Sequence, residues 1–241
     1  MHNKESQAGR VDGSHSISDR AMRKLGADIV AGKYQPGDRL LTEIESAELY
    51  GISRSAYREA CRSLTAKGLL NSRQKAGTTI NPRARWQLLD PEILEWSFQN
   101  RPTAEFVDAL FELRLTLEPM AAGLAAQRRT SVQLADLHSL VADLSNPTLP
   151  SNERLKAKRM FHVALFDASQ NEFLVSLGEG IGAAAEWTAA LSAELSDIQC
   201  NPAPDHIRTI RAIEVQSSEM ARNAATTLLL LAQEQCFRTF C

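Results

Sequence analysis

The chain has 241 residues, of which 44% are hydrophobic and 23% are charged, so it can bury the core of one large domain or two ordinary ones and is not disordered throughout. No apolar run approaches the roughly 20 residues that a membrane helix needs, and the first residues lack the apolar stretch of a secretory signal. The four cysteines include no Cys-x-x-Cys pair, which disfavours a disulfide framework and favours a reducing cytoplasm.

Charge is distributed unevenly along the chain. Residues 1–85 carry 15 Lys and Arg against 9 Asp and Glu, a net charge of +6, whereas the remainder carries 12 against 20, a net charge of −8. A basic segment joined to an acidic body indicates a polyanionic partner for the first part only. A charged surface that is merely solvated is the alternative.

The first predicted domain covers residues 16–82 and follows a polar tail, residues 1–15, that we expect to be disordered. We expect a helix that ends at Gly32, a second that opens with the capping box Thr42-x-x-Glu45, and a third over residues 54–67 that Ser53 caps. Leu49 on the second helix is expected in the core. Two short strands, residues 69–73 and 78–81, flank a turn. This order is typical of a winged helix-turn-helix.

A connector at residues 83–101 is predicted to contain a short amphipathic helix that starts at Asp90-Pro91 and packs the two domains together. Residues 102–241 show helical patterns only, with helices expected at 103–129, 131–144, 152–169, 171–196, 205–214 and 217–238. Gly178, Gly180 and Gly182 are expected to loosen the fourth of these. The predicted fold is therefore mainly α: an N-terminal winged helix-turn-helix followed by a C-terminal all-α antiparallel helical bundle.

The third helix carries side chains suited to reading DNA. Arg54 and Arg58 lie one turn apart near its N-terminal end, where a recognition helix usually reaches base edges. An arginine can donate two parallel hydrogen bonds to guanine. Ser53 and Ser55 can donate to phosphates, together with the amides at the start of the helix. A helix rich in arginine that only faces water is the alternative.

The segment GKYQPGDRLLTEIESAELYGISRSAYREACRSLTAKGLLNSRQKAGTTI, residues 32–80, resembles the winged helix-turn-helix of GntR-type transcription regulators. The resemblance implies that Arg54 and Arg58 are the main operator-contacting side chains, supported by Arg39 and the hairpin loop. Lys75 and Gly77 lie at the tip of that loop, where they can approach the minor groove or the backbone. The chain departs from the family by Ile44, where an Arg is frequent, and by Ser46, where a core Leu is common.

Three later segments, FELRLTLEPMAAGLAA (111–126), MFHVALFDASQN (160–171) and HIRTIRAI (206–213), resemble the FCD effector domain of FadR-like GntR regulators. The connector WQLLDPEILEW (86–96) is most similar to the galactonate-operon repressor branch. The resemblance implies a homodimer that binds DNA and responds to a small organic acid held in the bundle. By its residues alone, Arg114 needs either a structural bridge to Glu118, four residues on, or a bound carboxylate. The family's matching Arg faces the effector, which favours the second.

Many FCD domains bind a divalent metal through one Asp and three His, and the resemblance places those positions at Lys158, His162, His206 and Leu228. Two of the four ligands are absent, and the Lys158 ammonium would repel a cation, so we expect no metal or other cofactor. We hypothesise instead that Lys158 grips the ligand's carboxylate beside Arg114, His162 and His206. The alternative is that Lys158 reaches solvent and the pocket has degenerated.

No motif of an enzyme was found: the sequence has no Gly-rich phosphate loop, no HExxH and no GxSxG. The predicted function is therefore that of a ligand-responsive, DNA-binding transcription regulator, a cytoplasmic homodimer that represses a sugar-acid or related carboxylate operon. One alternative is a DNA-binding dimer whose bundle is only structural. Another is a sensor of acyl thioesters, which the polar set around Arg114 disfavours.

Overall fold

A computed structural model describes residues 17–73, 77–195, 203–238 and 240. The tail expected at residues 1–15 and the predicted contact residue Lys75 lie outside these ranges. The chain divides into two compact units between Trp86 and Gln87, within the stretch that the sequence assigns to the connector.

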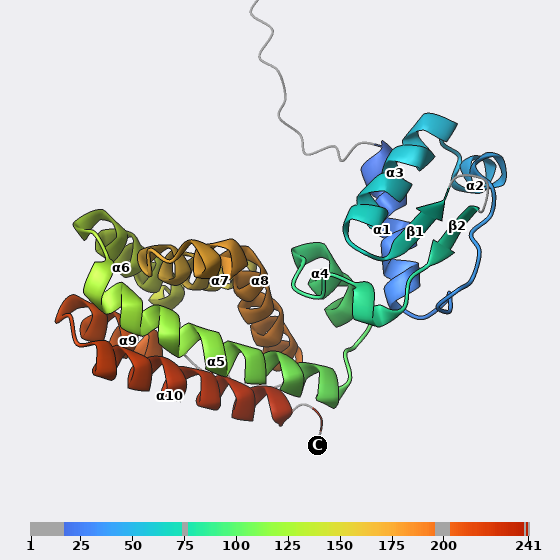
Figure 1. Cartoon of the computed structure of the whole chain (residues 1–241). Helices are drawn as coiled ribbons and strands as arrows, with labels where there is room; N and C mark the ends of the chain where they lie inside the picture. Colours follow the sequence, from blue (N-terminus) through green and yellow to red (C-terminus); the bar gives the residue numbers. More distant parts are fainter. Residues whose placement is uncertain (1–16, 74–76, 196–202, 239, 241) are drawn as a thin grey trace, which may run out of the picture. The chain divides into compact units, whose positions relative to one another are not determined.

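The first unit is a helical domain with a small β-hairpin (Figure 1). Its elements are α1 (Ile17–Val30), α2 (Glu43–Tyr50), α3 (Arg54–Ala66), β1 (Leu70–Arg73), β2 (Gly77–Ile80) and the 3-10 helix η1 (Arg83–Arg85). The strands pair antiparallel, with Leu70 opposite Ile80, and an isolated bridge joins Arg39 to Thr79. Helices α1 and α3 pack together over a core of Leu25, Ile29, Leu64 and Leu69. This is the winged helix-turn-helix that the sequence predicts.

Local capping chemistry sets the helix-turn-helix. Thr42 and Glu45 form both hydrogen bonds of the predicted capping box at the start of α2. Gly51 ends α2 in the left-handed conformation, with φ 63° and ψ 38°, which glycine adopts at little cost. Ser53 then caps α3 by accepting a hydrogen bond from the backbone N–H of Ala56.

The prediction that Leu49 lies in the core is wrong, because its side chain is 67% exposed. The short helix α2 buries Ser46 and Ala47 instead. Leu49 lies two residues after Ala47, which turns it about 200° around the helix axis, away from the buried side. The buried Ser46 hydroxyl donates to the backbone oxygen of Leu41 at 3.3 Å, so its polar group is satisfied.

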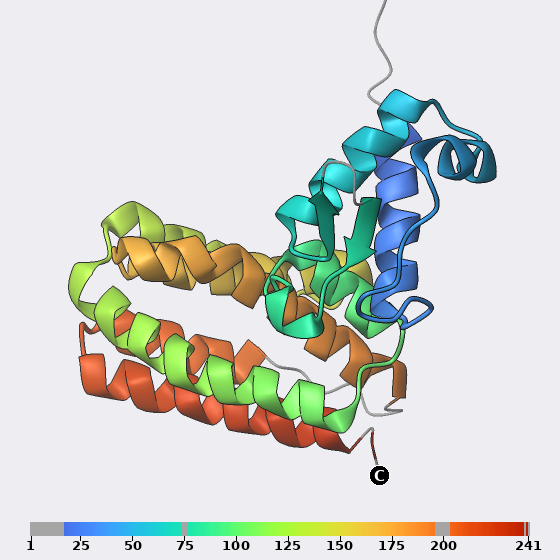
Figure 2. The same ribbon diagram turned by 45° about the vertical axis from the view of Figure 1, so that its right-hand side comes forward.

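The second unit is an all-helical bundle. Its elements are α4 (Pro91–Gln99), α5 (Ala104–Arg128), α6 (Ser131–Ser145), α7 (Ser151–Ala168), α8 (Glu172–Leu195), α9 (Ala203–Glu214) and α10 (Ser218–Phe237). Figures 1 and 2 both show α5 and α10 side by side, and α7 contacts α8 along its length. The connector helix α4 begins at the predicted Asp90 cap and lies against α8. Among the described helices, none combines the length and the apolar character that a membrane crossing requires.

Small side chains let the bundle helices approach closely. The main core cluster joins alanines such as Ala122, Ala125 and Ala225 to the buried Phe161 and Leu165. The expectation that three glycines loosen α8 is wrong, because α8 is one continuous helix. A Cβ atom at Gly180 would lie 2.4 Å from the backbone oxygen of Leu89, and one at Gly182 would lie 2.8 Å from that of Arg159. These glycines therefore permit tight packing.

We expect Gly180→Ala to lower the free energy of unfolding by about 1–3 kcal/mol, because the added methyl group meets backbone that cannot rotate away. Gly178→Ala is the control on the same helix, since its Cβ would meet no atom nearer than 3.4 Å. That variant should gain up to about 1 kcal/mol from helix propensity. Urea denaturation of both variants measures the difference, and equal stabilities would contradict the packing role of Gly180.

Candidate DNA interface and effector site

The start of α3 presents polar side chains to solvent. Ser53, Arg54 and Ser55 are exposed, and the Ser53 and Ser55 hydroxyls lie 3.0 Å apart. Within the described ranges, no hydrogen bond or ion pair holds the Arg54 guanidinium. The opposite face of α3 buries Tyr57, Ala60 and Leu64. One face of the helix thus anchors it, and the other is open to a partner.

Arg58 is exposed but already oriented. Its Nε and Nη2 atoms donate to the two carboxylate oxygens of Glu43 on α2, at 3.2 Å and 2.8 Å. This hydrogen-bonded pair raises the pKa of Arg58 and lowers that of Glu43. An exposed pair contributes little to stability, but a bidentate pair fixes direction. Glu43 therefore sets where the remaining N–H groups of Arg58 point.

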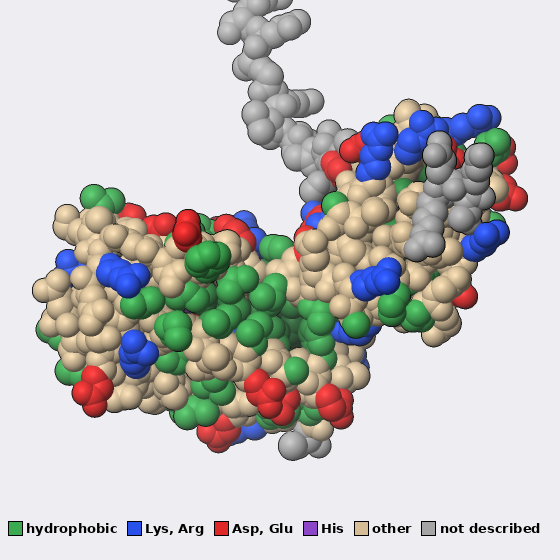
Figure 3. All heavy atoms as spheres, viewed as in Figure 1, with side chains coloured by type: hydrophobic (Ala, Val, Ile, Leu, Met, Phe, Trp, Pro, Cys, Tyr) green, Lys and Arg blue, Asp and Glu red, His purple; other side chains and the backbone are tan. Residues whose placement is uncertain are grey.

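Two further predicted contact residues, Arg39 and Gly77, lie at the β-hairpin. Arg39 is exposed beside β2, held by its bridge to Thr79. Gly77 opens β2 with φ 82°, a conformation that side chains rarely adopt. Figure 3 shows Lys and Arg side chains gathered over the upper edge of the first unit, where Figure 1 places α2 and α3. The basic side chains that the sequence analysis counts in the first part of the chain are thus exposed together on the surface of the first unit.

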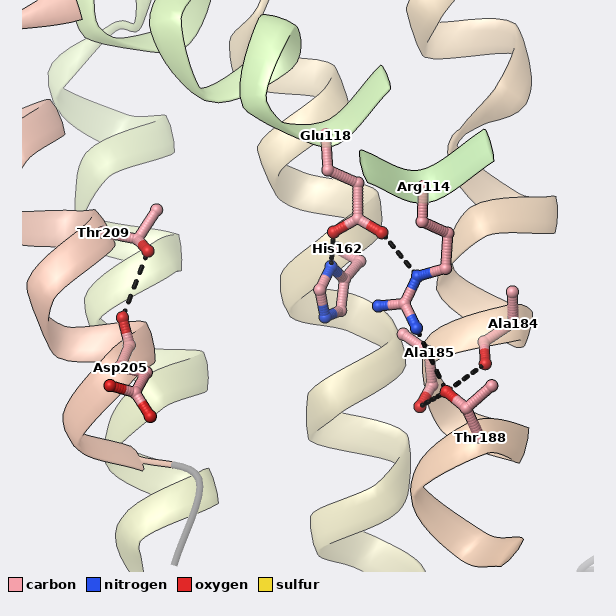
Figure 4. Close-up of polar contacts among 8 residues, drawn as sticks. All are labelled: Arg114, Glu118, His162, Ala184, Ala185, Thr188, Asp205 and Thr209. Atoms are coloured by element: carbon pink, nitrogen blue, oxygen red, sulfur yellow. Dashed lines mark hydrogen bonds and ion pairs between the residues drawn. The ribbon is translucent and has the colours of Figure 1, made fainter. Parts of the chain in front are cut away.

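In the second unit, Arg114 forms the bridge to Glu118 that the sequence analysis left as the alternative to a bound carboxylate, and this bridge is fully buried. Arg114 Nε donates to Glu118 Oε1 at 2.6 Å, and both side chains are 1% exposed. The other carboxylate oxygen, Oε2, lies 2.7 Å from His162 Nδ1 of α7 (Figure 4). Arg114 Nη1 also donates to Thr188 Oγ1 of α8 at 3.1 Å. One buried network therefore joins α5, α7 and α8.

Charge and burial compete within this network. Burial acts to raise the pKa of Glu118, but Arg114 and His162 outweigh it and lower that pKa to about 2. Burial lowers the pKa of His162 despite the opposing pull of Glu118. At neutral pH, Glu118 is therefore a carboxylate and His162 a neutral imidazole.

Lys158 and His206 lie around the same network. Burial, with the Arg114 charge in support, lowers the pKa of Lys158 to about 8, against the opposing pull of Glu118 and Cys236. The His206 side chain of α9 is fully buried, with its ring centroid 5.9 Å from that of His162. The structure thus brings together the four residues that the sequence analysis predicts as ligand-binding: Arg114, Lys158, His162 and His206.

These residues do not fit a resident divalent metal. Structural zinc sites use four protein ligands and catalytic ones three. Here both Glu118 oxygens already contact Arg114 or His162. The protonated Lys158 side chain is itself positively charged and repels a metal ion. Leu228 is a buried hydrocarbon that offers no ligand atom. Over the part of the chain that the structure describes, no group of three or more His, Cys, Asp or Glu side chains is arranged to hold a metal ion.

Sequence reasoning missed two contributors. Glu43, which holds Arg58, lies one residue after a recognised helix cap, but its pairing requires the fold of the helix-turn-helix. Thr188 supports Arg114 from 74 residues away. The only local signal for Thr188 is a hydroxyl in an otherwise alanine-rich stretch, AAAEWTAAL.

We expect Glu118→Gln to lower the free energy of unfolding by about 3–5 kcal/mol, because it leaves the buried Arg114 guanidinium without a counter-charge. Glu153→Gln is the control: Glu153 pairs with Lys156 at 2.9 Å on the exposed face of α7 and should cost at most about 1 kcal/mol. Chemical denaturation checks both. A silent Glu118→Gln would mean that the network does not stabilise the bundle.

Comparison with known proteins gives matches to both units. The family model described as "Bacterial regulatory proteins, gntR family" matches residues 17–80, and the model of the FCD domain matches residues 109–230. The HTH-type transcriptional regulator YieP of Escherichia coli (strain K12) is 37% identical over 173 residues, which cover 70% of this chain and 74% of YieP. The galactonate operon transcriptional repressor of the same organism is 30% identical over 218 residues, 88% of this chain and 93% of the repressor.

A solved structure supports the fold. Lar, which controls the expression of the Listeria monocytogenes agr system, aligns with a TM-score of 0.66 at 18% identity, over 94% of this chain and 99% of Lar. The two matched domains and the two Escherichia coli relatives indicate the same family. The chain is a DNA-binding transcription regulator that belongs to the GntR family of bacterial regulatory proteins, in the FadR-like group that carries an FCD domain.

Proposed function

We propose that this regulator represses an operon for the catabolism of a sugar acid or a related carboxylate, and that the acid binds in the FCD bundle. The observation that carries the proposal is the buried network, in which two cationic side chains, Arg114 and Lys158, lie near the single carboxylate of Glu118. Arg114 is fully buried and Lys158 is partly buried. An excess of positive charge with little access to water favours an anionic ligand. Similarity to a galactonate operon repressor supports the same ligand class.

In the proposed mechanism, α3 enters the major groove of operator DNA. Arg54 is open for base contacts, Arg58 is aimed by Glu43, and Arg39, Lys75 and Gly77 approach the backbone or the minor groove. Ser53 and Ser55 contact phosphates through their hydroxyls. Much of the affinity then comes from phosphate contacts, so binding weakens as salt increases.

We further propose a homodimer, because two-fold operators require two recognition helices related by symmetry. Hydrophobic side chains gather across the face of the second unit in Figure 3, and exposed apolar residues include Met120, Met160 and Phe173. Apolar patches of this kind commonly mark protein interfaces. In this proposal the protein acts in the cytoplasm, where its operator DNA is found. It regulates by binding alone, so it needs neither catalysis nor a cofactor.

The acid changes DNA affinity only if it binds unequally to the two shapes of the dimer. The network can make the affinities of the two conformations differ. An anion that binds Arg114 or Lys158 changes the electrostatic forces between α5, α7 and α8. An acyl thioester is disfavoured as ligand, because this cluster is polar and compact.

We expect Arg54→Ala to weaken binding to DNA from upstream of the protein's own gene by about 1–3 kcal/mol and to relax its sequence preference. Lys33→Ala is the control, because Lys33 lies in the turn after α1, where it pairs with Asp28. Fluorescence anisotropy at several salt concentrations measures both. If Arg54→Ala binds as well as the parent protein, α3 is not the reading helix.

We expect one member of a panel of sugar acids and hydroxy acids to change the affinity for that DNA. The same acid, at about 100 times its dissociation constant, should add about 2.7 kcal/mol of stability. Thermal unfolding with and without each acid, followed by anisotropy with the hits, checks this. A flat panel would support the other candidate, a DNA-binding dimer whose bundle is only structural.

A further inference from the structure

The buried network around Glu118, together with the partly buried Lys158 beside it, carries positive charge that its own residues do not neutralise. Glu118 is shared between Arg114 and His162, so its single negative charge is already matched by Arg114. Of the groups whose charge acts on Lys158 in the described part of the chain, Glu118 is the one carboxylate. Cys236 stays a neutral thiol, because burial raises its pKa. When Lys158 is protonated, the cluster therefore holds one uncompensated positive charge.

Hydrogen-bond donors are also left over. Within the described residues, no group accepts a hydrogen bond from Arg114 Nη2, and none pairs with Lys158 Nζ. Figure 4 shows the remaining terminal nitrogen of Arg114 on the side where His162 lies. Because Lys158 precedes His162 by four residues on α7, both project from the same face of that helix. The charges of Arg114 and Lys158 both act on the His162 ring.

The contact with Glu118 fixes the tautomer of His162. A lone pair on Nδ1 would repel the carboxylate oxygen 2.7 Å away, so Nδ1 carries the hydrogen. In the neutral ring, Nε2 is then an acceptor. Both ring nitrogens are buried, and within the described residues neither meets the geometry of a hydrogen bond. Nδ1 nevertheless lies 2.7 Å from Glu118 Oε2, so Nε2 is the nitrogen left for a ligand. A buried acceptor without a partner is costly, and the hydroxyl group of a ligand can satisfy it.

We propose that this site holds a hydroxycarboxylate without a metal ion: the carboxylate of the ligand accepts from Lys158 Nζ and Arg114 Nη2, and a neighbouring hydroxyl donates to His162 Nε2. The inference rests on the proposed function and names the chemical class of its ligand. Lys158 supplies the positive charge that a bound cation would otherwise provide, and the ligand carboxylate completes the charge balance. A neutral sugar lacks the group that both cations require.

The test is isothermal titration calorimetry with D-galactonate and D-gluconate, using protein dialysed against excess EDTA. We expect the affinity for the better probe to be unchanged by EDTA or by added Mn²⁺ or Zn²⁺. Lys158→Met should weaken it by about 10- to 100-fold, and Lys158→Arg should lose less. Lys156→Met is the control, because Lys156 lies on the exposed face of the same helix and pairs with Glu153.

Two further measurements separate the parts of the site. His162 also holds Glu118, so the hydroxyl is tested through the ligand: the 2-deoxy analogue of the better probe should bind the parent protein about 10-fold more weakly. The double variant Lys158→Asp, Leu228→His should acquire one bound metal ion per chain and a metal requirement for the acid. Thermal unfolding confirms that each variant is folded.

Loss of acid binding on chelation, or equal affinities of Lys158→Met and Lys156→Met, would overturn the metal-free site while leaving the proposed function intact if the acid still changes DNA affinity. Binding of neither probe would overturn the hydroxycarboxylate assignment. The anisotropy panel would then decide separately whether any carboxylate regulates DNA binding.

Discussion

The sensing unit depends on one buried carboxylate. Glu118 accepts a hydrogen bond from Arg114 and contacts His162, and Arg114 extends the network to Thr188. Removing one partner of a buried ion pair is far more costly than removing an exposed one, so α5, α7 and α8 are held in a single arrangement. Within the described residues, the same arrangement leaves Arg114 Nη2 and Lys158 Nζ without an acceptor and His162 Nε2 without a donor. In the site that we propose, the side chains that stabilise the bundle therefore also bind the ligand.

The DNA-reading unit uses an ion pair differently. Arg58 and Glu43 are both exposed, with 55% and 48% of their side chains accessible, so water screens their attraction and the pair adds little stability. Its effect is geometric, because two parallel hydrogen bonds keep Arg58 in one orientation while Arg54 stays open. Burial thus decides whether a charged pair mainly stabilises the fold, as Arg114 and Glu118 do, or mainly orients a side chain, as Glu43 orients Arg58.

Helix ends could be predicted because their chemistry is local. The predicted caps at Thr42 and Ser53 each act within three residues along the chain, and the structure places a helix start at both. It also places one at the predicted start Asp90-Pro91. The errors arose where a distant segment decides. Leu49 is exposed because α2 turns another face inward, and Gly180 is required by the backbone of Leu89, which nothing in the sequence around Gly180 reveals.

The sequence by itself determined the elements, the two-part organisation and the basic third helix. Its resemblance to FCD domains predicted Arg114, Lys158, His162 and His206 as ligand-binding residues. Periodicity, capping and charge counts are properties of neighbouring residues, so they can be recognised without coordinates. Only the tertiary structure decided which groups meet: Arg58 with Glu43, His162 with Glu118, and Arg114 with Thr188. Such pairings depend on how helices far apart in sequence pack and rotate against one another, and this packing also determines which donors and acceptors are left for a ligand.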